Sequence, residues 1–275
     1  MSLEDGGEAR IAATFARCRA EGRAAFVPYL TALFPDAPRS LAAARTLLQH
    51  ADLLELGLPF SDPLGDGPTI QRSSEVALRA GASTAGLMRM LRTLRAETSA
   101  PLIVMTYYNP IYCYRGPAGE GEEAFVADLR AAGADGVILP DLPPDEGETL
   151  IAAARRHDLA TIFLVAPTST DARLRLVSAA SRGFIYAVSV TGVTGARDAV
   201  GAEIGDLVRR TKAQSDLPVA VGFGVSTPAN AADVAGFADG VVVGSRLVQA
   251  IAADDDVGPI AAALAAACRR PAAEG

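Results

Sequence analysis

The stretch LLELGLPFSDPLGDGPTIQ, residues 53–71, joins a short apolar run to a loop rich in Pro and Gly. The run at 53–58 shows no in-and-out alternation, which is typical of a parallel strand buried on both faces. Together with seven other β-rich runs, most of them equally apolar, it predicts eight strands, at 24–30, 53–58, 101–108, 136–142, 161–166, 184–190, 218–225 and 240–245.

Amphipathic segments alternate with these runs. Segment 84–97, for example, places Leu87, Leu91 and Leu94 on one helical face. Eight strand-helix units predict an α/β fold, a TIM (β/α)8 barrel with extra helices at the N-terminus, after strand two and at the C-terminus. No interdomain linker is visible, so residues 1–275 are expected to form a single domain, with an N-terminal helix within 1–22 and a disordered tail at 271–275.

Composition narrows the class of protein. Half of the 275 residues are apolar, which is enough for a sizeable core. The formal net charge is −7 and no basic run occurs, which argues against nucleic acid or an anionic membrane surface as the main partner. The N-terminus has no apolar signal-peptide core and no long unbroken apolar run follows, so a cytoplasmic protein without membrane association is expected.

Several kinds of catalysis lack suitable residues. Lys212 is the only lysine and lies at the end of a predicted surface helix, which argues against Schiff-base chemistry. His50 and His157 each fall near a predicted helix C-terminus, where helix-end packing is the simpler interpretation. The widely separated cysteines have no C-x-x-C spacing and indicate free thiols rather than a zinc site or disulfides: Cys18, Cys113 and Cys268. No metal site is predicted.

Two carboxylates remain as candidates for acid/base chemistry. Glu55 lies among leucines within the second strand, where burial raises the pKa of a carboxyl group toward the range useful for proton transfer. The alternative is a Glu paired with a cation inside the barrel. Asp66 precedes a Gly in the loop PFSDPLGDGPT, and on its own it is more typical of a turn residue.

Glycines at the ends of the last three strands suggest an anion site. Gly192, Gly195 and Gly224 permit close approach of the backbone, and a short helix is predicted to open at Gly244 and Ser245. In TIM barrels the loops after strands seven and eight commonly hold a phosphate. The residues alone therefore indicate a barrel enzyme that acts on a small phosphorylated molecule by carboxylate acid/base catalysis.

A family resemblance rests on six motifs in order. They are ELGLPFSDPLGDGPTIQ, YYNPIY, GVILPDLP, SVTGVTGA, GFGVST and VVVGS. In this order and at these spacings, they resemble the tryptophan synthase alpha subunit from about Phe26 to Ile251. The resemblance implies a lyase of tryptophan biosynthesis that cleaves indole-3-glycerol phosphate to indole and glyceraldehyde 3-phosphate. This retro-aldol reaction needs neither a Schiff base nor a metal.

The resemblance also implies roles for individual residues. Glu55 would protonate indole C3 and then take the proton of the glycerol 3'-hydroxyl, and Asp66 would hold the indole N–H and stabilise the charge on the ring. This replaces the turn-only interpretation of Asp66. The matching phosphate-binding positions are Gly195, Phe223, Gly224, Gly244 and Ser245. The expected substrate-pocket positions are Tyr29, Tyr186, Thr194 and Leu142, although residues of these types at strand ends are more often simply core.

The family's usual partner is a beta subunit that carries pyridoxal phosphate, so no cofactor is expected in this chain itself. The resemblance places the docking surface at Pro59, Asp62, Asn109 and Pro143. Two alternatives stay open: a stand-alone lyase that releases free indole for a specialised pathway, and a regulatory subunit with weak activity. Stimulation of indole release by a beta subunit would distinguish a conventional alpha subunit from both alternatives.

Three segments depart from the family pattern. TALFPD stands at Thr31 to Asp36 where TAGDP is usual, Val190 replaces a position that is often polar, and the loop from Tyr114 to Glu123 is longer. These departures bear on coupling to a partner and leave the two carboxylates and the phosphate positions intact.

Overall fold

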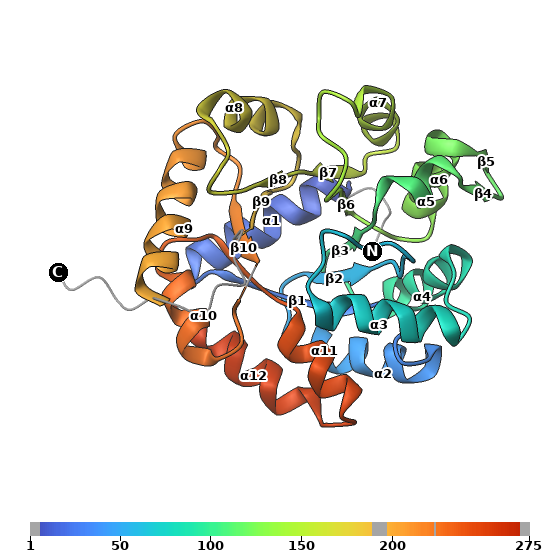
Figure 1. Cartoon of the computed structure of the whole chain (residues 1–275), viewed down its shortest axis with the longest axis horizontal. Helices are drawn as coiled ribbons and strands as arrows, with labels where there is room; N and C mark the ends of the chain where they lie inside the picture. The colour runs from blue at the N-terminus through green and yellow to red at the C-terminus, as the bar shows by residue number, and fades with distance from the viewer. Residues whose placement is uncertain (1–5, 189–196, 223, 270–275) are drawn as a thin grey trace.

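Parallel strands form a ring in the computed structural model, which describes residues 6–188, 197–222 and 224–269 (Figure 1). The strands are β1 (Ala25–Thr31), β2 (Leu54–Gly57), β3 (Leu102–Met105), β6 (Gly136–Ile138), β7 (Ala160–Ile162), β8 (Leu164–Val165), β9 (Ile185–Val188), β10 (Val219–Gly222) and β11 (Gly240–Val243). Their order is β7-β6-β3-β2-β1-β11-β10-β9-β8, and every pairing is parallel.

One bent strand closes the ring. Only Phe163 separates β7 from β8, and while β7 pairs with β6, β8 pairs with β9 on the other side. The nine pieces thus occupy eight strand positions, and the predicted TIM barrel is confirmed. The strand predicted at 161–166 is the one that is divided.

Several predicted strands are longer than the observed ones. The strand predicted at 101–108 ends at Met105, and the one predicted at 136–142 ends at Ile138. In both places residues after the strand end, such as Tyr107 and Leu142, are still buried although the backbone has left the sheet. The apolar run therefore overestimates strand length at the carboxyl ends.

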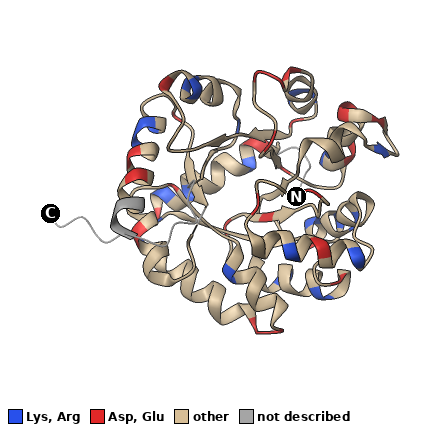
Figure 2. Cartoon of the chain, viewed as in Figure 1, with Lys and Arg blue, Asp and Glu red and all other residues tan. Residues whose placement is uncertain are grey.

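Helices surround the ring. They are α1 (Gly7–Ala20), α2 (Ala37–Leu48), α3 (Pro68–Arg79), α4 (Thr84–Glu97), α5 (Tyr108–Tyr112), α6 (Gly121–Ala131), α7 (Glu148–Arg156), α8 (Asp171–Ala180), α9 (Arg197–Lys212), α10 (Pro228–Ala235), α11 (Ser245–Ala252) and α12 (Val257–Ala267). The expected extra helices correspond to α1, to the pair α3 and α4 after β2, and to α12. The tail at 271–275 lies outside the described residues. Figure 2 shows basic and acidic residues interspersed over these outer helices.

The segments that depart from the family pattern have definite local structure. Thr31 ends β1, and the side chain of Asp36 caps α2 by accepting a hydrogen bond from the backbone N–H of Arg39 at 2.9 Å. The loop from Tyr114 to Glu123 contains a two-residue hairpin, β4 (Arg115–Gly116) with β5 (Gly119–Glu120), and then the start of α6. Val190 lies outside the described residues.

Helix α1 closes the N-terminal end of the barrel. The ring of Phe15 packs 5.5 Å from that of Phe184, centroid to centroid, just before β9. Asp135, which precedes β6, pairs with Arg10 of α1 and with Arg95 of α4 and accepts a backbone hydrogen bond from Leu102 at 2.9 Å. The buried Asp135 carboxylate therefore ties α1, α4 and β3 together at the N-terminal end of the barrel.

Candidate active site

Glu55 is fully buried in β2 and has no partner among the described residues. It lies in register with Tyr29 of β1 and Ile103 of β3, and neither of its carboxylate oxygens makes a hydrogen bond. Burial, and secondarily the charge of Asp66, raises the pKa of Glu55 to about 8. The alternative of a Glu paired with a cation is therefore wrong. At neutral pH this side chain mostly carries a proton that it can donate.

Asp66 is half-buried in the loop between β2 and α3. Its backbone N–H donates to Pro63 O at 3.0 Å, so the residue does take part in a turn, as the loop sequence predicts. Its side chain lines the same cavity as Glu55. Burial raises the pKa of Asp66 to about 6, and a hydrogen bond from Tyr107 opposes that increase. Asp66 is thus more acidic than Glu55, and near pH 7 one carboxyl is charged while the other is protonated.

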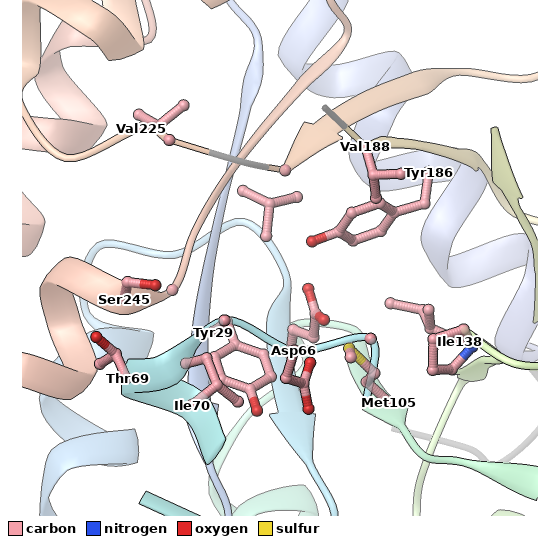
Figure 3. A pocket seen from close by; sticks show the side chains of 18 of the residues that line it. Tyr29, Asp66, Thr69, Ile70, Met105, Ile138, Tyr186, Val188, Val225 and Ser245 are labelled. Atoms are coloured by element: carbon pink, nitrogen blue, oxygen red, sulfur yellow. The ribbon is translucent and has the colours of Figure 1, made fainter. Parts of the chain in front are cut away.

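The cavity at the barrel mouth has a volume of about 430 Å³. All eight strand positions contribute to its wall, through Tyr29, Glu55, Met105, Ile138, Leu164, Tyr186, Val188, Gly222 and Val242. Figure 3 shows Thr69 and Ser245 on one side of the view, Met105 and Ile138 on the other, and Asp66 between them. The cavity therefore has hydroxyl groups on one side and the apolar side chains of Met105 and Ile138 on the other, with the Asp66 carboxylate between them.

Two tyrosines fill space beside the carboxylates, and glycines make room for them. A Cβ on Gly57 would lie 2.1 Å from the hydroxyl oxygen of Tyr29, and one on Gly222 would lie 2.1 Å from that of Tyr186. Burial raises the pKa of both tyrosines well above the ordinary value, so they remain neutral. The predicted pocket positions Tyr29 and Tyr186 thus line the cavity as neutral hydroxyl groups.

Backbone amides lie on the side of the cavity that carries the hydroxyl groups. Gly244 and Ser245 lie where β11 passes into α11, and both line the cavity together with Gly224 and Ser226. Gly224 has φ +70°, a conformation that favours glycine. The first turn of a helix presents free N–H groups suited to an anion. The other two predicted phosphate positions, Gly195 and Phe223, and the predicted pocket position Thr194 lie outside the described residues.

One predicted pocket residue does not reach the cavity. Leu142 is buried but packs near Gly147, in the loop before α7, and it is not among the described residues that line the cavity. Pro140 takes that place. The apolar pattern of GVILPDL predicts a strand up to residue 142, whereas β6 ends at Ile138, so Leu142 lies beyond the strand and away from the cavity.

Tyr107 is a site residue without a predicted role. It lies between β3 and α5, and its hydroxyl hydrogen-bonds the carboxylate of Asp66 and accepts the backbone N–H of Gly65 at 3.0 Å. The motif YYNPIY marked this segment, but nothing in the sequence indicates which tyrosine faces the carboxylate.

The positions expected at a partner surface differ in exposure. Asp62 and Asn109 are exposed, Pro143 is half-buried, and Pro59 is buried by the chain itself. Near them, Leu64 of the loop after β2 is 90% exposed and Tyr112 of α5 is 67% exposed. The loop after β2 and helix α5 thus present large apolar side chains to solvent beside the cavity.

The remaining polar candidates lie away from the cavity. His157 caps the end of α7, where its Nε2 lies 2.7 Å from Glu123, and the Nζ of Lys212 at the end of α9 lies 2.9 Å from Asp239. Within the described ranges, no cluster of three or more His, Cys, Asp or Glu side chains is arranged to hold a metal ion. None of the described helices has the length and apolar character needed to cross a bilayer.

Comparison with known proteins identifies the family. The family model "Tryptophan synthase alpha chain" matches residues 15–272. The alpha chain of Deinococcus radiodurans is 52% identical over 267 residues, 96% of each chain, and that of Streptomyces avermitilis is 50% identical over 86% of this chain and 83% of its own.

Solved structures agree with the sequence comparison. A chain of Mycobacterium tuberculosis tryptophan synthase superposes with a TM-score of 0.87 at 44% identity, over 95% of this chain and 99% of that one. The tryptophan synthase alpha subunit of Legionella pneumophila superposes with a TM-score of 0.83 at 36% identity, over 94% and 97%. A barrel with two uncompensated carboxylates at its mouth, matched over nearly its whole length by these relatives, belongs to the tryptophan synthase alpha chain family.

Proposed function

We propose that this chain is a carbon–carbon lyase that cleaves indole-3-glycerol phosphate to indole and glyceraldehyde 3-phosphate, as the alpha subunit of a tryptophan synthase. The observation that carries the proposal is the order of groups in the cavity: amides and hydroxyls on one side, apolar side chains on the other, and Asp66 between them in a cavity that Glu55 also lines. The substrate has the same order, with a phosphate, a hydroxylated carbon chain and an indole ring.

Glu55 supplies both proton transfers in the proposed reaction. Its protonated carboxyl donates to indole C3, and the resulting carboxylate then takes the proton of the 3'-hydroxyl while the bond between indole C3 and the glycerol carbon breaks. The hydroxyl oxygen becomes the aldehyde oxygen of glyceraldehyde 3-phosphate, and Glu55 is protonated again. The pKa of about 8 suits this role, because the donor form dominates at neutral pH.

Asp66 stabilises the charge that this protonation creates. Protonated indole carries a positive charge that is shared with its ring nitrogen, and an ionised Asp66 accepts the indole N–H and opposes that charge. Its pKa of about 6 leaves it ionised while Glu55 is still protonated. The unequal environments of two neighbouring carboxyls thus assign the two roles.

The other ends of the substrate have matching surroundings. The backbone at Gly224, Gly244 and Ser245 is suited to the phosphate. Gly195 and Phe223 are proposed as further phosphate contacts, and Thr194 is proposed as a residue of the substrate pocket. Met105 and Ile138 are suited to the indole ring. The proposed chemistry is proton transfer and charge stabilisation by side chains, so it requires no metal and no cofactor in this chain.

A tryptophan synthase beta subunit, which carries pyridoxal phosphate, is the proposed partner. The exposed side chains of Asp62 and Leu64 belong to the loop that holds Asp66, and those of Asn109 and Tyr112 belong to α5, which directly follows Tyr107. Pro143 is proposed as a further contact. A partner that packs on this loop would therefore act directly on a catalytic group.

The test is steady-state release of indole from indole-3-glycerol phosphate by the purified chain, with and without a tryptophan synthase beta subunit. We expect slow release alone and strong stimulation by the partner. Fast release that the partner does not change would indicate a stand-alone lyase. Absence of release in both assays would refute the proposed reaction and favour a regulatory subunit.

A further inference from the structure

Tyr107 holds two consecutive residues of the catalytic loop with one hydroxyl group. Its oxygen accepts the backbone N–H of Gly65 at 3.0 Å, and the same hydroxyl donates to the carboxylate of Asp66. The approach is close, since a Cβ on Gly65 would lie only 3.2 Å from that oxygen. Tyr107 is 6% exposed and is not among the described residues that line the cavity, so it acts on Asp66 from behind.

The ring of Tyr107 is fixed as well as its hydroxyl. It stacks on the ring of Phe60 at 5.2 Å between centroids and 29° between planes. The Thr106 hydroxyl also donates to the backbone carbonyl of Tyr107 at 3.1 Å. Since Phe60 begins the loop and Asp66 lies near its end, one rigid side chain contacts both parts of the loop.

Gln71 of α3 holds the same loop in a different way. Its side-chain amide donates to the backbone carbonyl of Asp66 at 2.8 Å and to that of Pro63 at 3.4 Å. These contacts restrain the backbone but do not involve the carboxylate. Gln71 and Tyr107 therefore separate two effects, restraint of the loop alone and restraint combined with a hydrogen bond to the reacting charge.

No cation opposes the charge of Asp66 among the described groups that face it. These groups are Glu55 of β2, Tyr29 of β1, Tyr186 of β9, Tyr107 and, beyond Tyr107, Asp141 of the loop after β6. Burial raises the pKa of Asp66, and the hydrogen bond from Tyr107 lowers it. The Tyr107 hydroxyl thus does the work that an arginine or lysine performs at most buried carboxylates.

We propose that Tyr107 is a positioning residue for the lyase reaction, which keeps Asp66 ionised and directed into the cavity without contacting the substrate. The inference rests on the proposed function, because it assigns Asp66 the task of holding the indole N–H. It adds a group that the reaction requires from outside the cavity.

Tyr107→Phe tests the inference, because it keeps the stacked ring and removes only the hydroxyl. We expect kcat/KM for indole release to fall about tenfold near pH 6.5 and the acidic limb of its pH profile to move to higher pH. The sign follows from the hydrogen bond: without the donor, Asp66 keeps its proton to a higher pH, and the loss shrinks as the pH rises. A variant that is merely misfolded would lose rate without moving the limb.

Two variants serve as controls. Tyr114→Phe removes the hydroxyl of a similarly buried tyrosine that donates to Asp128 of α6 at 2.8 Å and does not line the cavity, and we expect the wild-type profile. Gln71→Ala removes the backbone restraint, and we expect a lower rate at every pH with the acidic limb unmoved. A Tyr107→Phe profile with an unmoved limb, whether its rate is normal or uniformly reduced, would overturn the inference.

A direct titration keeps this test independent of the proposed reaction. The carboxyl carbon of Asp66, assigned in carbon-13 NMR spectra by comparison with Asp66→Asn, is titrated in the wild-type chain and in Tyr107→Phe. We expect a higher midpoint in the variant, and equal midpoints would refute the contact between Tyr107 and Asp66. Failure of the wild-type chain to release indole would instead refute the proposed function.

Discussion

Asp52 and Glu55 lie close together in the sequence, Asp52 just before β2 and Glu55 within it, and their carboxylates meet opposite environments. Asp52 pairs with Arg17 and Arg23 and accepts the backbone N–H of Phe26 at 2.9 Å. Burial acts to raise the pKa of Asp52, but the hydrogen bonds from Arg23 and Phe26 outweigh it, and the pKa is lowered. Glu55 has burial without any of these partners, and its pKa is raised to about 8.

The difference shows how the barrel divides stability from chemistry between its two ends. Asp135, also at the N-terminal end, is as fully buried as Glu55, and burial still raises its pKa despite Arg10 and Arg95. Burial alone therefore does not distinguish the two ends. The presence of arginines at one end makes carboxylates into structural ties, and their absence at the other makes a carboxyl group a proton donor.

The largest expected effect is the loss of turnover in Glu55→Gln. The amide keeps the shape of the side chain but cannot exchange a proton, so we expect kcat to fall about 10³-fold while the affinity for indole stays close to wild type. Asp52→Asn is the matched change at the buried carboxylate just before β2. Under conditions in which it is folded, the Asp52→Asn variant should keep the wild-type kcat. Comparable losses of kcat in both variants would contradict the assignment of chemistry to Glu55 and of stability to Asp52.

The next largest effect is a loss of stability in Asp52→Asn. Asp52→Asn removes the buried carboxylate that Arg17 and Arg23 share and leaves them only the half-exposed Glu21, so we expect the free energy of unfolding to fall by about 3 kcal/mol, as measured by urea denaturation. Asp254→Asn is the control, since its ion pair with Arg39 lies in solvent and should contribute little. If both changes had the same small effect, the role of Asp52 as a structural tie would be wrong.

The sequence predicted the parts of the site that depend on neighbours along the chain. An apolar run with one carboxylate indicated β2 and Glu55, and a loop rich in Pro and Gly indicated where Asp66 lies. The eight strands were predicted because each is a separate apolar run. Their carboxyl ends were not, because buried residues such as Leu139 and Leu142 continue the apolar pattern after β6 has ended.

Contacts between distant segments could not be predicted from the sequence. Tyr107 meets Gly65 across 42 positions, and Tyr107 and Tyr108 are indistinguishable as letters although their hydroxyls reach different carboxylates, Asp66 and Glu122. The bend at Phe163 that closes the ring is likewise a consequence of barrel geometry rather than of local preference. The roles assigned to Glu55 and Asp66 stay predictions until the variants are measured.

A pH-dependent gain concerns the cost of keeping Glu55 in place. Its pKa is about 8 in the folded chain against an ordinary value of 4.5, so between these pH values the folded state holds a proton that the unfolded state has lost. Stability from this group is therefore present below pH 4.5 and is lost as the pH rises toward 8. The free energy of unfolding of Glu55→Gln should exceed that of wild type by about 4 kcal/mol at pH 8 and should be close to that of wild type at pH 4.5. A gain that does not depend on pH would show that packing, not charge, is responsible.

The smallest effect tests how much of the Glu55 pKa comes from its neighbour. Burial is the main cause and the charge of Asp66 the second, so Asp66→Asn should move the carbon-13 NMR titration midpoint of Glu55 downward while leaving it well above the ordinary value. Asp52→Asn removes the negative charge that is neutralised by Arg23 just before the same strand, and it should leave that midpoint unchanged. If Asp66→Asn returned Glu55 to an ordinary titration, charge repulsion rather than burial would set its pKa. The proton donor would then exist only while Asp66 is ionised, and the two carboxyl groups would titrate as one coupled pair.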